Sequence, residues 1–71
     1  MRATEAPPAV LDYMAEYGET EQEFRDWLHR QRRAFDALAD TSGTDFPRWL
    51  KFKMGCSRRD AVSVVKWAGL E

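Results

Sequence analysis

Cationic and hydroxyl side chains gather in the last third of this 71-residue chain, in and before the stretch KMGCSRRDAVSVVKWAG at 53–69. Arginine and lysine donate hydrogen bonds to phosphate oxygens, and arginine also fits the acceptor edge of guanine. A serine hydroxyl both donates and accepts. The residues that could do this chemistry are Arg48, Lys53, Ser57, Arg58, Arg59, Ser63 and Lys66. Their types predict non-covalent recognition of phosphate groups and base edges.

Covalent and metal chemistry has little support in the sequence. Cys56 is the single cysteine and His29 the single histidine, which nearly excludes a structural metal and a disulfide. A cysteine flanked by arginines at a helix start can have a lowered pKa, but a small buried residue is the favoured interpretation of Cys56. The chain has no Gly-rich phosphate loop and no carboxylate pair with a supporting base. We therefore expect no enzymatic activity, no cofactor and no metal.

The charge of the chain is divided unevenly. Residues 1–45 carry ten acidic residues against five arginines, a net charge of −5, whereas residues 46–71 carry six basic residues against two acidic ones, a net charge of +4. The total of −1 therefore conceals a polarised molecule. A basic half of this kind provides the sequence-independent attraction that phosphate backbones require.

The element that must position these side chains is a helix that starts after Ser57 and ends near Ala68, before Gly69. Ser57 and Asp60 form an S-x-x-D cap at its start. A helical wheel puts one set of residues on the inward side: Ala61, Val62, Val64, Val65 and Ala68. The outward side then holds Arg59, Asp60, Ser63, Lys66 and Trp67. Arg59, Ser63 and Lys66 follow one another at i, i+4 and i+7, so they could enter one groove together.

Three further helices are indicated upstream. Pro7-Pro8 opens the first, which Gly18 ends. Thr20 and Glu23 form a capping box for the second, which is expected to end near Asp40. The third starts around 45–47 and runs to Met54. No stretch shows the alternation of a strand, so we predict an all-α, compact three- to four-helix domain spanning 1–71, with 1–6 as a flexible tail.

The C-terminal half resembles a helix-turn-helix module over residues 47–67. Leu50 and Met54 stand on its first helix, Gly55 at its turn, and Ser57 at the cap of its second helix. The resemblance implies that the second helix enters the major groove of DNA with its N-terminal residues on the bases. The family most often has alanine where Lys51 stands here, so this crossing must leave room for a lysine to reach solvent.

A second resemblance covers residues 24–48. Phe24-x-x-Trp27-Leu28, Leu38-Ala39-Asp40 and Asp45-Phe46-Pro47-Arg48 are similar to the opening of the YozE/SAM-like small helical proteins. This family has no settled biochemical role. The resemblance implies a compact helical fold and carries no activity.

Two residues are candidates for contact with a partner molecule. Gln31 lies between Trp27, Leu28 and Phe35 on the apolar face of the second helix, so we expect it to be at least half buried or to sit in a subunit contact. Trp67 lies away from the inward stripe, which makes it either a lid over the edge of the core or an interface residue. Trp27 and Trp49 are predicted to be core residues, and a homodimer is possible because a chain this short has a marginal core.

The predicted function is a nucleic-acid-binding protein of helix-turn-helix type, a transcription regulator or accessory factor from a phage or mobile element. The alternative is a protein-binding inhibitor that docks on a larger host or defence complex, as anti-CRISPR proteins do. Its acidic N-terminal half could mimic DNA or cover a basic surface. The N-terminus lacks a secretory signal pattern, and no segment approaches the length of apolar residues that a membrane span needs. We expect a cytoplasmic protein.

Overall fold

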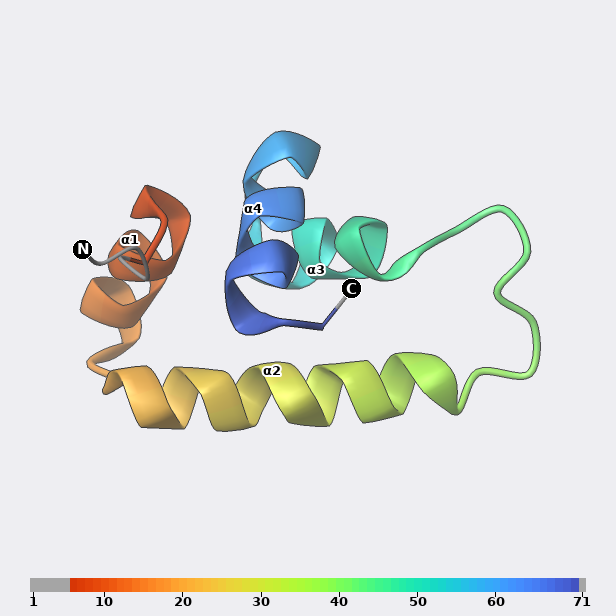
Figure 1. Cartoon of the computed structure of the whole chain (residues 1–71), viewed down its shortest axis with the longest axis horizontal. Coiled ribbons are helices and arrows are strands. Elements are labelled where there is room, and N and C mark those ends of the chain that lie inside the picture. Colours follow the sequence, from red (N-terminus) through yellow and green to blue (C-terminus); the bar gives the residue numbers. More distant parts are fainter. Residues whose placement is uncertain (1–5, 71) are drawn as a thin grey trace.

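A computed structural model describes residues 6–70, which form four helices: α1 (Pro8–Tyr17), α2 (Glu21–Asp36), α3 (Phe46–Met54) and α4 (Arg58–Ala68). Helix α2 is the longest and runs along one edge of the molecule. Helices α1, α3 and α4 all lie on the same side of α2 (Figure 1). No strand is present in the described part of the chain. The predicted all-α class is therefore confirmed.

The predicted helix starts are confirmed by their caps. The Thr20 hydroxyl accepts a hydrogen bond from the Glu23 N–H at 3.1 Å, and the Glu23 carboxylate accepts one from the Thr20 N–H at 2.8 Å. Asp45 caps α3 through the Arg48 N–H at 3.0 Å. These bonds satisfy N–H groups that have no partner within the first turn of a helix.

Helix α2 ends at Asp36, four residues before the predicted end near Asp40. The Leu38 N–H bonds to the Phe35 carbonyl, which tightens the last turn. Asp40 instead accepts bonds from the N–H and hydroxyl of Ser42, at 2.9 and 2.7 Å. Such local side-chain bonding competes with helix formation. Leu38 follows the helix periodicity but is exposed, so no core contact offsets that competition.

All four helices contribute to one core. Its buried members are Val10, Phe24, Leu28, Phe35, Phe46, Leu50, Ala61, Val64 and Val65. The three tryptophans are only partly buried and pack around this core. Trp27 and Trp49, predicted as core residues, therefore lie at its edge. The aromatic rings still form a continuous series, since Phe24 stacks on Trp27 at 5.7 Å and Phe35 meets Trp49 edge-on at 5.8 Å between ring centroids.

A turn of three residues joins α3 to α4. Gly55 adopts φ +68°, a conformation that favours glycine, and its N–H bonds to the Lys51 carbonyl at 2.9 Å. Ser57 then caps α4 through the Asp60 N–H at 3.2 Å. Helix α3 also packs more extensively on α4 than any other pair of helices does. The fold thus holds α4 firmly by its N-terminal end.

Two expectations concern the ends of the chain and membranes. The predicted flexible tail, residues 1–6, lies outside the described residues except for Ala6, which is partly buried against the core. None of the helices in residues 6–70 combines the length and apolar character that a membrane-spanning helix needs.

Candidate nucleic-acid interface

The outward face of α4 carries three of the predicted contact residues. Arg59, Ser63 and Lys66 are all exposed, whereas Ala61 and Val64 on the opposite side of the helix are fully buried. The 100° turn per residue of an α-helix places the three exposed side chains within one narrow sector. The structure therefore brings Arg59, Ser63 and Lys66 together as one polar and cationic strip, which we call the α4 strip.

Arg58 is positioned differently from the α4 strip. Its guanidinium donates two hydrogen bonds to Asp45, at 3.0 Å to Oδ1 and 2.7 Å to Oδ2. These bonds, followed by the bond from the Arg48 N–H, lower the pKa of Asp45 to about 2. The Arg58 side chain remains 54% exposed, but two of its donors are occupied by the fold. A paired arginine of this kind has less to offer a phosphate or a base edge than Arg59 has.

Ser57 has a structural task as well as an exposed position. Its hydroxyl accepts the capping bond from Asp60 and keeps its own hydrogen available for donation. Because α4 starts immediately after it, Ser57 also marks the positive end of the helix dipole. The serine therefore lies where a phosphate would be attracted, at the edge of the α4 strip.

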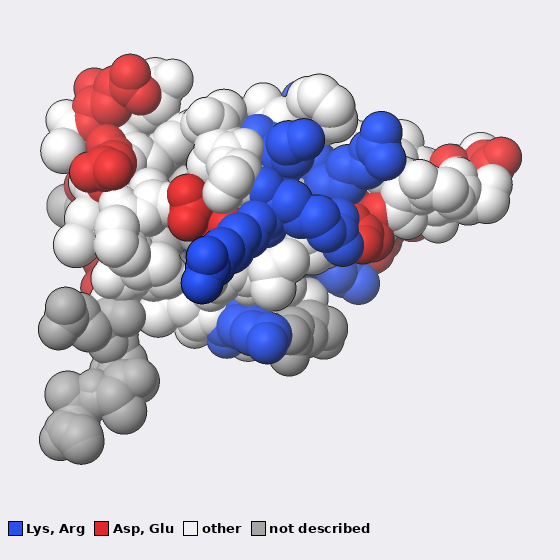
Figure 2. Space-filling model, turned by 90° about the horizontal axis from the view of Figure 1, so that it is seen from above, with Lys and Arg blue, Asp and Glu red and all other residues white. Residues whose placement is uncertain are grey.

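Helix α3 adds three further exposed cations: Arg48, Lys51 and Lys53. The Lys53 ammonium lies 5.1 Å from the Trp49 ring centroid and the Lys51 ammonium 5.6 Å from that of Phe52. Lys51 reaches solvent, so its charge is not buried where α3 meets α4. In Figure 2, Lys and Arg side chains form a band over α3 and α4, while Asp and Glu side chains lie at the α1 end, beside the band and at the opposite end of the molecule.

Phe52 is a surface residue that the sequence did not draw attention to. It is 70% exposed and stands on α3 between Lys51 and Lys53. Position 52 lies about 200° around the helix from Leu50, a fully buried residue. That angle, read from the sequence, indicates an outward Phe52.

Gln31 and Trp67 both lie at the edge of the core. Gln31 is partly buried, as predicted, and its Oε1 accepts a hydrogen bond from the Trp49 indole N–H at 3.1 Å. Trp67 is partly buried against the core, with the Arg25 guanidinium 3.9 Å from its ring centroid. This position agrees with the first of the two predicted alternatives, a lid over the edge of the core, and the contact with Arg25 of α2 is what a wheel of α4 alone could not include. A role in a partner contact stays a prediction for both residues.

Cys56 lies in the turn between α3 and α4, and His29 lies on α2. Burial, and secondly the Asp60 carboxylate, raise the pKa of the Cys56 thiol, so the thiolate form is disfavoured. This agrees with a small, partly buried residue in the turn. His29 is exposed on α2. Among residues 6–70, no three His, Cys, Asp or Glu side chains lie close enough to hold a metal ion.

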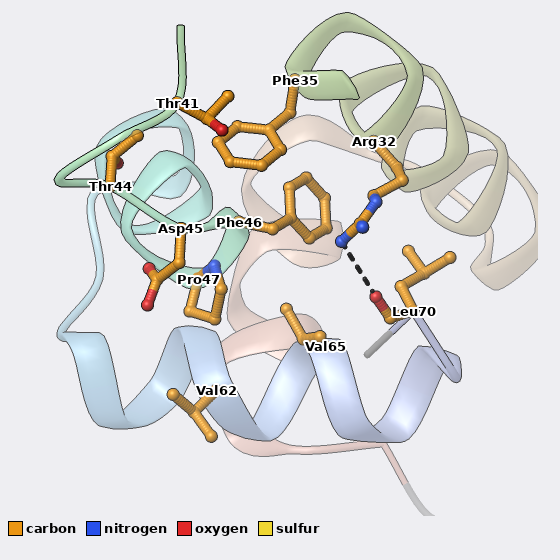
Figure 3. A pocket seen from close by; sticks show the side chains of 10 residues that line it. All are labelled: Arg32, Phe35, Thr41, Thr44, Asp45, Phe46, Pro47, Val62, Val65 and Leu70. Carbon is orange, nitrogen blue, oxygen red and sulfur yellow. Dashed lines mark hydrogen bonds between the residues drawn. The ribbon is translucent and has the colours of Figure 1, made fainter.

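A pocket of about 380 Å³ opens between α2, α3 and α4 (Figure 3). Its walls are mainly apolar, with Phe35, Phe46 and Val65 among the lining residues. Arg32 extends across one end and donates a hydrogen bond to the Leu70 carbonyl at 3.2 Å. The pocket does not include any residue of the α4 strip.

Comparisons with family models, curated proteins and solved structures yield no match to this chain.

Proposed function

We propose that this chain is a small nucleic-acid-binding protein of helix-turn-helix type, which places the α4 strip in the major groove of a duplex. The supporting observation is the exposure of Arg59, Ser63 and Lys66 on one sector of α4, opposite the buried Ala61 and Val64. Arg59 is the base-reading residue, Ser63 donates or accepts a further bond, and Lys66 neutralises a phosphate. A regulatory or accessory role in a phage or mobile element belongs to the same proposal.

The cations of α3 supply the backbone contacts. Arg48, Lys51 and Lys53 lie on the helix that precedes the α4 strip, where the first helix of such a module crosses the phosphate backbone. The acidic residues of α1 lie toward one end of a molecule 37 Å long. Since the Debye length is about 8 Å at physiological ionic strength, the repulsion from the α1 residues is screened at the basic band, whereas Asp60, exposed on α4 next to Arg59, offsets part of the positive charge of the band.

The test is fluorescence anisotropy of a labelled mixed-sequence duplex at about 50 and 200 mM salt. Saturable binding is expected at the lower concentration. If about three phosphates are contacted, the logarithm of the binding constant falls with a slope of about −3 against the logarithm of salt concentration. An absence of binding at the lower salt concentration would overturn the proposal.

The alternative is a protein that docks on a larger complex, and one feature favours it. The pocket between α2, α3 and α4 has apolar walls of a kind that can receive a side chain of another protein. This alternative requires a partner whose binding is lost when Val62, at the pocket wall, becomes Glu. The proposed duplex contact requires no such loss, because it uses the α4 strip instead.

A further inference from the structure

Phe52 is the most exposed large apolar side chain in the described part of the molecule. It is 70% exposed, compared with 61% for Tyr17, 50% for Leu11 and 41% for Leu38. It does not belong to the core or to the residues that pack around it. Single exposed apolar residues are common on protein surfaces, so the exposure of Phe52 becomes informative only together with the residues around it.

The charged residues that surround Phe52 on its own helix are all cations. Helix α3 contains Arg48, Lys51 and Lys53 and no acidic residue. Arg48 lies one turn before Phe52, a rise of about 6 Å along the axis, and the two lysines are its direct neighbours. The nearest acidic side chain in sequence, Asp45 at the cap, is paired with Arg58. The Lys51 ammonium lies 5.6 Å from the centroid of the Phe52 ring.

We propose that Phe52 is a stacking platform for an unpaired base, with Arg48, Lys51 and Lys53 on the neighbouring phosphates. Binding sites for single-stranded nucleic acid combine these two elements, a cationic surface for the backbone and an aromatic face for the base. The inference rests on the proposed function and adds the class of ligand: a duplex that continues into a single-stranded segment. The α4 strip lies in the major groove of the duplex, and the α3 cations follow the phosphate backbone from the duplex into the unpaired nucleotides.

The charges around Phe52 favour nucleic acid over a protein partner. The centre of a protein interface is depleted of lysine, because burial of an unpaired ammonium is costly. Phe52 stands between two lysines and one turn from an arginine. The ring is also of little use against an uninterrupted duplex, in which every base face is covered by its neighbours. An unpaired base offers a free face and brings its own phosphates to the three cations.

The experiment compares three labelled ligands: a blunt duplex, the same duplex with a thymidine overhang, and the same duplex with an abasic overhang of equal length. The abasic overhang keeps every phosphate and removes every base. The wild type is expected to bind the thymidine overhang about tenfold more tightly than the abasic one. Phe52→Ala should remove that difference and leave blunt-duplex binding unchanged, whereas Phe52→Tyr should retain it.

Tyr17→Ala is the matched control, because Tyr17 is also an exposed aromatic residue but stands on the acidic helix α1. It should leave all three affinities unchanged. Urea unfolding of Phe52→Ala should match the wild type, which separates loss of binding from loss of structure.

Each contrary outcome has a distinct meaning. Equal affinity of the wild type for the thymidine and abasic overhangs, with blunt-duplex binding intact, would overturn the stacking role and leave the proposed function standing. The same holds if Phe52→Ala keeps the preference for thymidine. A wild type that binds none of the three ligands at about 50 mM salt would overturn both proposals. Loss of a protein partner through Phe52→Ala, with the thymidine preference unchanged, would assign Phe52 to a protein surface.

Discussion

Within the part of the chain that the structure describes, Arg25 and Arg32 of α2 pair within the fold, as does Arg58 of α4, whereas Arg59 of α4 does not. Arg25 bonds to Glu21 at 3.1 Å and covers the Trp67 ring, and Arg32 bonds to Asp36 at 3.2 Å and to the Leu70 carbonyl. Arg59 of α4 takes part in none of the ion pairs present in residues 6–70. Arginine content therefore does not define a binding surface.

The cause of this difference is visible in the spacing of the acidic residues. Arg25 and Arg32 of α2 each pair with a carboxylate four residues away, at the distance where side chains meet on a helix. The corresponding neighbours of Arg59 are Gly55 and Ser63, and neither is acidic. A cation without a carboxylate at that spacing stays available to a ligand. The same argument separates Arg59 from Arg58, whose partner comes from the cap of α3.

The largest expected effect is a loss of stability when the core shared by all four helices is disrupted. Leu50→Ala removes a fully buried side chain of α3 and should lower the free energy of unfolding by about 2–5 kcal/mol. Urea unfolding followed by circular dichroism measures the change. Far-ultraviolet signal and tryptophan fluorescence should report a single transition. Two separate transitions would show that the helices do not unfold as one cooperative unit.

Arg59→Ala tests directly whether Arg59 is available to a nucleic-acid ligand. It should weaken duplex binding by about 1–3 kcal/mol through a lost base contact, with the free energy of unfolding nearly unchanged. Lys66→Ala should weaken binding to all sequences alike and reduce the salt slope by about one. Arg30→Ala, an exposed arginine on α2, is the control and should leave affinity unchanged. Equal losses from Arg59→Ala and Arg30→Ala would remove the distinction between the two helices.

The caps of α2 and α4 provide a comparison of smaller size. Thr20→Ala removes one side of a reciprocal capping box and should cost about 1 kcal/mol of stability. Ser57→Ala removes a single accepted bond and should cost less. Thermal unfolding of both variants under the same conditions gives the order. A larger loss of stability for Ser57→Ala than for Thr20→Ala would show that the fold depends more on the cap of α4 than on the capping box of α2.

The smallest predicted effect is the acid sensitivity of the Asp45–Arg58 pair. Asp45 has a pKa of about 2 in the folded protein, below the value of about 3.9 that an unperturbed aspartate has. Its contribution to stability is therefore fully present above pH ~4 and is lost as the pH falls toward 2. Both side chains are about half exposed, so solvent screening keeps this contribution small. Asp45→Asn keeps a capping oxygen and should lose less stability than the wild type between pH 5 and pH 2.5, measured by urea unfolding. Parallel losses in the two proteins would contradict this assignment.

Local signals predicted most of the fold. Caps at Thr20, Asp45 and Ser57 and the glycines after three of the helices are short-range features, so the helix starts and three of the four ends follow from the sequence. The end of α2 was predicted too late, since Leu38 continues the apolar period although no neighbouring helix covers it. The inward stripe of α4 was predicted correctly for Ala61, Val64 and Val65, whereas Val62 and Ala68 proved only partly buried.

The parts of the site that escaped prediction depend on packing between helices. Asp45 and Arg58 are 13 residues apart, and only the path of the α3–α4 turn brings them together. Trp67 is covered by Arg25 of another helix, which a wheel of α4 alone does not contain. Phe52 was overlooked for a different reason. In a small protein an aromatic residue is expected to be in the core, but the position of Phe52 about 200° around the helix from the buried Leu50 indicates that it points to solvent.

The short turn between α3 and α4 limits how much conformational entropy these two helices would lose when a ligand binds across them. Its three residues are held at both ends, by the Gly55 N–H bond to Lys51 and by the Ser57 cap, so the two helices have little freedom to reorient. Association with a flexible surface loses conformational entropy, and this loss subtracts from affinity. A ligand that bridges α3 and α4 meets a surface already in its final arrangement. Lengthening this turn by glycines would therefore weaken the binding of such a ligand although every side chain of α3 and α4 is kept.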